Sequence, residues 1–412
     1  MRNYVSGQPL LSLKGNIYMY NEYEQNPNAQ NMDFTQPPPI GGGYVAVPQK
    51  KKYKIPDCDL DGLSPEIKKD RKILRKFHPE CKEIRKLALF CGLLMLIIEA
   101  VPVIIVYGNY YLGDSIGMIF YPFYFAANFL HTFCGSFAAT NIDQILYSTL
   151  LFIVPFTILA KSFKLDINKI AKFSRPKKGL TVPCLLIGVS FCSFANIAAS
   201  QTLTFLETIG FTGPGGAGGG SSSDVGIVGF ILAFISTAII PGLVEEFAFR
   251  GILFGALEKF GQGFALLSTS ILFGVLHGNI AQIPFAFLVG LGVGYVRVKT
   301  GSVWLCVIVH TINNGISVLY DYPLSGLPDG VQNLSYAIYL AVALLFGIVG
   351  IILLSKKENE KELFSLKKQD ATCDTRVTNR IFYMHPMILI FFAVIALGLL
   401  GGYNYSWIKN LW

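Results

Sequence analysis

The chain contains few charged residues, and this already limits the class of protein to which it can belong. Only 15% of its 412 residues are charged and 52% are hydrophobic, whereas an ordinary soluble domain is roughly 25% charged. Residues 87–355 hold 22 of the 60 charged residues, too little polar surface to cover so apolar a segment in water. The composition excludes a soluble enzyme, a disordered protein and a nucleic-acid-binding protein. It predicts a polytopic membrane protein.

Several motifs are absent as well. None of the eight cysteines forms a CxxC pair, so we expect neither a disulfide framework nor a zinc ribbon. There is no Walker loop, no GxGxxG after a strand and no alternating pattern typical of a β-barrel. Polar residues follow Met1, so we expect no cleavable signal peptide. The net charge of +8 comes from short basic segments beside apolar runs, which indicates orientation in a bilayer rather than nucleic-acid binding.

The apolar runs predict an all-α transmembrane bundle with about eight or nine spans. A span needs about 20 apolar residues, and the candidates are 87–107, 144–160, 181–203, 225–243, 263–280, 284–298, 302–320, 333–354 and 387–403. The basic segments lie before residue 87, at 161–178, at Arg297 and Lys299, and at 356–380. With a cytoplasmic N-terminus, nine spans place all four on the cytoplasmic side, as the positive-inside rule expects. The apolar stretch 116–138 must then be re-entrant or interfacial rather than a full crossing.

The chain divides into five regions by composition. Residues 1–65, rich in Asn, Gln, Pro and Gly, are predicted to form a disordered cytoplasmic tail. Residues 66–86 are predicted to form a basic amphipathic helix on the membrane surface, with a solvated charged helix as the alternative. Then come membrane helices in 87–208, a membrane core in 225–320, and C-terminal membrane helices in 321–412 with a charged cytoplasmic loop at 356–385. The Gly- and Ser-rich loop 213–223 falls on the outer side.

Ionisable side chains gather in the core region 225–320. Each costs about 2.5–3.5 kcal/mol on insertion scales, so several in one region indicate a function. They are Glu245, Glu246, Arg250, His277 and His310, followed one turn later by Asn314. Glu99 and His131 stand apart from this group. Glu99 has no predicted partner and stays a secondary functional candidate, and we interpret His131 as a helix-packing or interfacial residue.

Spacing predicts how these groups meet. Glu246 and Arg250 are four residues apart, so they can pair on one helix face. Glu245 points about 100° away, which leaves it free to face a cavity. Glu245 and His277 each lie 16 residues from Gly261, so a hairpin there sets both at a similar depth, about 24 Å from the turn.

A carboxylate, two imidazoles and an amide suit the hydrolysis of an amide bond. Glu245 can take a proton from water that His277 orients. His310 and Asn314, which share a helix face, can donate hydrogen bonds to the developing oxyanion. The spacing therefore predicts a hydrolytic site that lies within the membrane.

Three segments resemble the motifs of a known family. Residues 245–250 (EEFAFR), 273–277 (FGVLH) and 310–314 (HTINN) look like EExxxR, FxxxH and HxxxN of the CPBP family of intramembrane glutamate proteases. That family includes type II CAAX prenyl endopeptidases and bacteriocin-processing proteins. The resemblance covers roughly 180–320. It implies that Glu245 and His277 activate water and that His310 and Asn314 stabilise the oxyanion. The site-shaping residues are Glu246, Arg250 and Phe273.

Other interpretations stay open at this point. The charged residues at 245–250 can belong to the end of a span, where their side chains extend toward the membrane surface. A glutamate and two histidines can also ligate zinc, although the sequence contains no HExxH motif. A proton-coupled transporter uses similar residues, and a non-enzymatic binding or immunity protein can retain the same motifs. We expect no cofactor, and a hydrophobic peptide or lipidated protein as substrate. We place the protein in a bacterial cell membrane with its N-terminus in the cytoplasm.

Overall fold

The computed structural model describes residues 9–11, 17–19, 79–111, 136–208, 226–280, 282–357, 365–366 and 375–402. The chain forms two units, 1–65 and 66–412. In the first unit, β1 (Pro9–Leu11) pairs with the antiparallel β2 (Ile17–Met19). The tail was predicted to have no regular structure, and its residues other than these two short strands lie outside the described part.

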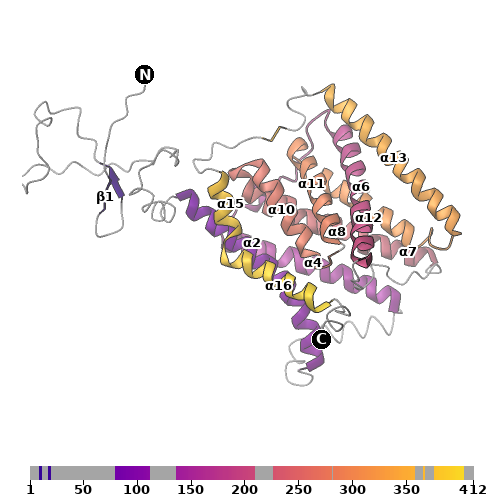
Figure 1. Ribbon diagram of the computed structural model, residues 1–412, viewed down its shortest axis with the longest axis horizontal. Coiled ribbons are helices and arrows are strands. Elements are labelled where there is room, and N and C mark those ends of the chain that lie inside the picture. The colour runs from indigo at the N-terminus through magenta and orange to yellow at the C-terminus, as the bar shows by residue number, and fades with distance from the viewer. Residues whose placement is uncertain are drawn as a thin grey trace, which may run out of the picture. The chain divides into compact units, whose positions relative to one another are not determined.

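The described residues of the second unit form helices connected by turns (Figure 1). Each of the nine predicted spans overlaps one of these helices. In chain order they are α2 (Pro79–Tyr111), α4 (Ser136–Ser162), α5 (Ile167–Ala171), α6 (Thr181–Thr208), α7 (Gly226–Phe234), η2 (Ile235–Ile239), α8 (Ile240–Glu246), η3 (Phe247–Leu253), α9 (Phe254–Leu257), η4 (Glu258–Phe260), α10 (Gln262–Leu276), α11 (Gln282–Thr300), α12 (Val303–Asp321), α13 (Asp329–Ser355), α15 (Thr375–Tyr383) and α16 (Pro386–Gly402).

Six described helices are long and apolar enough to cross a membrane, and a seventh crossing is formed if α15 and α16 act as one bent span. The six are α4, α6, α11, α12, α13 and the continuous helix Gly226–Phe260. The all-α membrane fold is thus confirmed, although eight to nine spans is slightly more than this count. One reason is that α10 has only 15 residues, fewer than a bilayer crossing needs.

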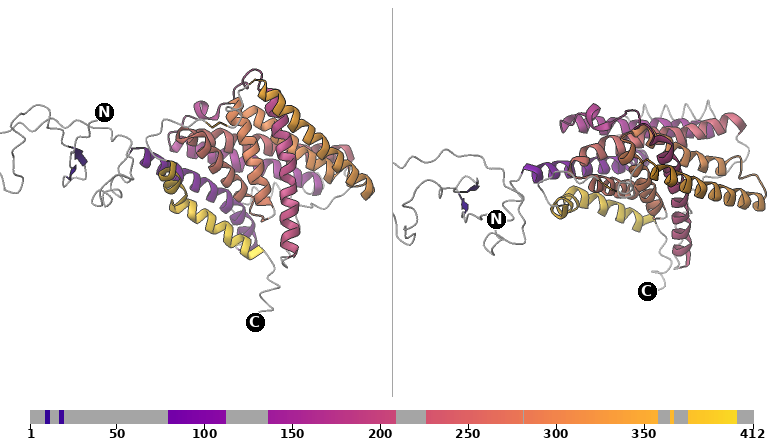
Figure 2. Two further views of the ribbon diagram at one scale, coloured as in Figure 1. Left: turned by 45° about the horizontal axis from the view of Figure 1, so that its top comes forward. Right: turned by 90° about the horizontal axis from the view of Figure 1, so that it is seen from above.

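The core of the second unit is built around α11 and α12. In their most apolar stretches 61% and 50% of the residues are buried, against 17% in both α4 and α13. Helix α11 packs against α6, α10 and α12, and α12 packs against η2 and α8. Helix α13 and the α2–α16 pair lie on opposite sides of this core (Figures 1 and 2). His310 lies on one of these two most enclosed helices, and Glu245, Glu246 and Arg250 lie on the continuous helix Gly226–Phe260 that packs against it.

The basic segments that the positive-inside rule grouped together lie at one end of the bundle. Lysines of the segments before residue 87 and at 161–178 make contacts there with other parts of the chain: Lys86 with Phe163 O, Lys172 with Glu258, and Lys177 N–H with Thr300 O. The side chain of Lys357 lies beside Gly179. The shared end agrees with the predicted topology, whereas the cytoplasmic orientation of that end stays a prediction.

Some predicted segments lie wholly or partly outside the described residues. They are the first part of the basic helix (66–78), most of the re-entrant stretch (116–135), the outer loop at 213–223, and most of the charged loop (358–364 and 367–374). The described part of the basic helix, 79–86, is the beginning of α2, which continues without a break through Leu87.

Candidate functional site

The helix that carries Glu245 and Glu246 is longer than the sequence suggested. Its predicted span ended at residue 243, whereas the helix runs continuously over Gly226–Phe260. Two π-helical segments, η2 and η3, flank α8, which ends at Glu246. A π-segment inserts an extra residue into a helical turn and is frequent at functional sites. Here the two segments redirect the side chains on either side of the glutamate pair.

Glu246 and Arg250 form a fully buried ion pair, as their spacing predicted. Glu246 is 0% exposed and Arg250 1%, and Arg250 Nη1 lies 2.8 Å from Glu246 Oε1. Arg250 Nη2 also donates a hydrogen bond of 3.2 Å to the carbonyl of Gly290 on α11. The guanidinium lies 4.7 Å from the centre of the Phe273 ring, a cation–π distance. Three helical segments are therefore joined around one buried charge pair.

His310 connects both glutamates. Its Nδ1 lies 2.7 Å from Glu246 Oε1, so the ring donates a hydrogen bond to the carboxylate and the tautomer is fixed. On the other side of the ring, Nε2 lies 3.9 Å from Glu245 Oε2. The Glu245 side chain is 19% exposed, so this carboxylate is the accessible one. The structure thus brings together Glu245, Glu246, Arg250 and His310, four of the predicted residues.

His277 lies at the end of α10, and its turn sets the ring. Gly278 has a φ of +60°, a conformation that glycine adopts without strain, and it ends the helix directly after His277. The His277 Nδ1 lies 2.8 Å from Phe273 O. The Phe273 ring is 4.9 Å from the His277 ring and 6.0 Å from the His310 ring. The similar depth of His277 and Glu245 that the hairpin at Gly261 implies stays a prediction.

Asn314 faces a different set of partners. Its Nδ2 donates a hydrogen bond of 3.1 Å to Thr237 O in η2. Its Oδ1 accepts from Asn313 Nδ2 at 3.1 Å, and Asn313 Oδ1 accepts from Asn196 Nδ2 at 3.4 Å. These contacts form an amide chain, Asn196–Asn313–Asn314, that joins α6 and α12 to a carbonyl of η2. Asn314 is therefore held firmly, one turn from His310, with one of its two N–H donors engaged.

Sequence reasoning missed three residues that surround this site. Asn196 and Asn313 complete the amide chain, and the only sequence signal was an amide within a predicted span. Arg297 was placed in a basic cytoplasmic segment, yet it is 1% exposed. Its Nε donates a hydrogen bond of 3.3 Å to Arg250 O. Only tertiary contacts reveal these roles. Asn196 and Asn313 are 117 residues apart and Arg297 is 47 residues from Arg250, whereas Asn313 and Asn314 are neighbours in the sequence.

Small residues let the site helices approach. A Cβ atom at Gly242 would collide with Thr311, the neighbour of His310. A Cβ atom at Gly315 would come within 2.8 Å of the Phe234 ring. Such close approach is typical of helix packing within membranes. It sets α8 and η2 directly against α12 and so brings Glu246 within reach of His310.

Two polar atoms of the buried cluster lack a hydrogen-bond partner among the described residues. They are Glu246 Oε2 and Arg250 Nε. Unsatisfied polar atoms in an interior are uncommon and call for an explanation. In the described part of the chain, no group of three or more His, Cys, Asp or Glu side chains is arranged to hold a metal ion. The cluster contains a buried ion pair and a hydrogen-bonded imidazole, with one accessible carboxylate at its edge.

Fold and site together define a multi-pass membrane protein with a Glu–Arg–His cluster enclosed by its core helices. Within that class, residues 227–316 match the family model "Type II CAAX prenyl endopeptidase Rce1-like". All of the motif residues from Glu245 to Asn314 fall within this match. The resemblance predicted from the three motifs is confirmed for this region.

One curated relative agrees with the family match. The chain is 30% identical over 89 residues to the "Putative membrane peptidase YdiL" of Bacillus subtilis (strain 168), which covers 21% of this chain and 36% of the relative. The match thus spans about a third of the relative's length. No solved structure matches the chain significantly.

Proposed function

We propose that this protein is an intramembrane endopeptidase that hydrolyses a peptide bond of a hydrophobic or membrane-associated substrate. The observation that carries the proposal is the accessible Glu245 carboxylate beside His310, whose other ring nitrogen is bound by the buried Glu246. The Rce1-like match and the membrane peptidase relative support the same class of activity.

In the proposed mechanism Glu245 is the general base. It takes a proton from a water molecule that His277 orients, and the water oxygen adds to the carbonyl carbon of the substrate. The C–N bond then breaks, and Glu245 returns the proton to the leaving amine. No step of this sequence requires a metal ion.

The oxyanion is assigned to His310 and Asn314. Because Glu246 accepts from Nδ1, the His310 ring is held in one orientation, and Nε2 donates to the substrate oxygen when both ring nitrogens carry a proton. Asn314 uses one N–H for the carbonyl of Thr237 and retains a second N–H for the same oxyanion. Donors held in place before the reaction supply the largest electrostatic part of such catalysis. Arg250 and Phe273 act as positioning residues, through Glu246 and the two imidazoles.

Cleavage by the purified full chain in detergent tests this proposal. The substrates are synthetic hydrophobic peptides, with and without a farnesylated C-terminal cysteine, and products are identified by mass spectrometry. We expect Glu245→Gln to lower kcat by at least about 100-fold, as loss of a general base does. Glu83→Gln is the matched control, because this exposed glutamate lies at the basic end of the bundle, paired with Lys259.

Three outcomes contradict parts of the proposal. Full activity of Glu245→Gln removes that residue as the base. If a metal chelator by itself abolishes cleavage by the unmodified protein, the enzyme is a metallopeptidase in which His277 and His310 are ligands. If the protein binds every peptide of the set and cleaves none of them, the binding or immunity role is indicated instead.

A further inference from the structure

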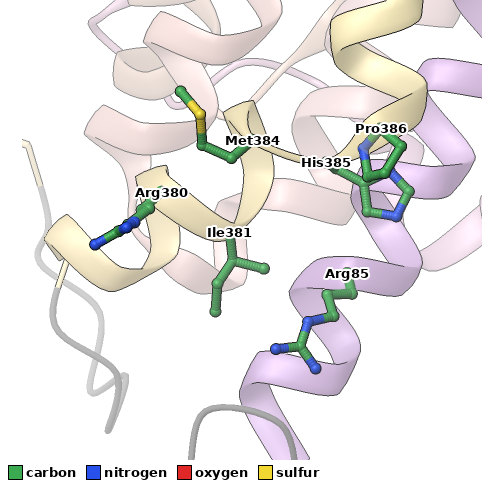
Figure 3. Close-up of a pocket in the computed structure, with 6 residues that line it drawn as sticks. All are labelled: Arg85, Arg380, Ile381, Met384, His385 and Pro386. Carbon is green, nitrogen blue, oxygen red and sulfur yellow. The ribbon is translucent and has the colours of Figure 1, made fainter. Parts of the chain in front are cut away.

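A cavity at the bend between α15 and α16 has no part in the proposed peptidase site. Its volume is about 380 Å³, and it is lined by Arg85, Arg380, Ile381, Met384, His385 and Pro386. Arg85 comes from α2, and the other residues come from the end of α15 and the start of α16 (Figure 3). In that view Ile381 lies between the two arginines and the His385 ring lies above Arg85.

The cavity lies where two neighbouring segments change from polar to apolar. Helix α15 (TRVTNRIFY) is polar and basic, whereas α16 (PMILIFFAVIALGLLGG) has no charged residue, and the two meet at an angle of 57°. Helix α2 changes in the same way after Lys86. Because both changes occur beside one cavity, we place the cavity at the boundary between lipid headgroups and hydrocarbon.

The polar groups of the cavity suit an anion. Among the described residues, its lining includes two guanidinium groups and an imidazole but no carboxylate. The Met387 N–H donates a hydrogen bond of 3.3 Å to His385 Nδ1, so the neutral ring carries its proton on Nε2 and can donate it to a ligand. The His385 ring and the Arg85 guanidinium line the same cavity, so one anion between them can accept hydrogen bonds from both groups.

The apolar groups of the cavity suit a chain attached to that anion. Met384 is 62% exposed, and Leu389 and Ile390, one turn further along α16, are also exposed. The start of α16 is held against α2, because a Cβ atom at Gly92 would lie 2.6 Å from Met387 Cβ. Phe382 and Ile388 are fully buried on either side of the bend. The cavity walls are therefore fixed in place without a ligand.

We propose that this cavity binds the phosphate group of an anionic phospholipid, with the acyl chains along the exposed apolar face of α16. Arginine guanidinium groups bind phosphate oxygens through paired hydrogen bonds, and basic pockets between membrane helices bind acidic headgroups. Free phosphate offers the same oxygens, but the boundary position and the adjoining apolar face favour the lipid. This inference does not depend on the proposed peptidase activity.

Lipid binding by the full chain tests the proposal. The purified protein in detergent is titrated with phosphatidylglycerol, phosphatidylcholine or inorganic phosphate, and bound molecules are counted by native mass spectrometry. We expect phosphatidylglycerol to bind more tightly than phosphatidylcholine. Arg380→Gln should weaken phosphatidylglycerol binding about fivefold, the factor for one lost cation at a lipid surface.

Arg175→Gln is the matched control, because Arg175 is an exposed arginine outside the cavity. Equal weakening by both variants shows diffuse attraction to the basic end and overturns the cavity site. Equal binding of the two lipids overturns it as well. Inorganic phosphate that binds alone and displaces phosphatidylglycerol reassigns the site to free phosphate. Unchanged thermal unfolding of Arg380→Gln shows that weaker binding does not come from misfolding.

Discussion

The inner helices α11 and α12 and the outer helix α13 are all long and apolar enough to span a membrane, but they differ in what they bury. Helices α11 and α12 enclose half or more of their most apolar residues, whereas α13 encloses 17%. Helices α11 and α12 bury Arg297 and His310, and the helix Gly226–Phe260 packed against α12 buries Glu246 and Arg250. Helix α13 buries only apolar residues and a glycine. Charges in a membrane protein face the bundle interior, where partners satisfy them. The difference shows that apolar composition places a helix in the membrane, while polar pairing decides which helices form the site.

The largest expected effect comes from removing one partner of the buried ion pair. Arg250→Ala leaves Glu246 as an uncompensated buried charge, which costs about 3–5 kcal/mol of unfolding free energy. Thermal unfolding in detergent measures the loss. The control is Lys172→Ala, which removes the exposed pair with Glu258 and should cost at most about 1 kcal/mol. If both variants lost the same free energy of unfolding, buried and exposed ion pairs would not differ in this protein.

A smaller effect is expected from crowding the contact between α10 and α11. A Cβ atom at Gly274 would lie 2.9 Å from Phe287 Cβ and 3.0 Å from the carbonyl oxygen of Ile283. Gly274→Ala should therefore destabilise the protein by about 1–3 kcal/mol and displace His277 at the end of α10. Gly330→Ala in α13 is the control, because no atom lies within 4 Å of its new Cβ. A neutral Gly274→Ala would contradict the tight packing of the inner helices.

The amide chain should contribute less to stability but act on catalysis. Asn313→Ala removes the donor to Asn314 Oδ1 and the acceptor of Asn196, which should cost about 1–2 kcal/mol. In the peptide assay we expect kcat to fall with KM nearly unchanged, because Asn314 is proposed to act in the transition state. Ser355→Ala in α13, which loses only a bond to Ile351 O, should leave both unchanged. A rise in KM alone would indicate a role in substrate binding instead.

The smallest effect is expected on the outer face of α13. Leu345 is 56% exposed within a helix that has few enclosed residues. Leu345→Ala removes atoms that face lipid or detergent, so the unfolding free energy should change by less than about 0.5 kcal/mol. Leu305→Ala, at a buried position of α12, should cost about 2–5 kcal/mol. A large loss for Leu345→Ala would show that another surface covers α13.

The fold was predictable where a local pattern controls it. Apolar runs located a helix at each of the nine predicted spans, and a glycine marked the turn before α10, where Gly261 has a φ of +115°. The Glu246–Arg250 pair followed from helical spacing. The extent of the membrane span before this turn was not predictable in this way. Charged residues after 243 predict the end of the apolar span, whereas tertiary partners keep them inside the bundle and the span continues to Phe260.

For the candidate site, the sequence by itself determined which residues are present, their spacing along each helix and the membrane as their solvent. It could not show that His310 binds Glu246, since the two are 64 residues apart and meet only where small residues let α8 and α12 approach. Nor could it show that Asn314 belongs to an amide chain with Asn196, or that Arg297 is buried. Those features are tertiary because a buried charge or amide is stable only beside a partner, and the packed helices decide which partner is within reach.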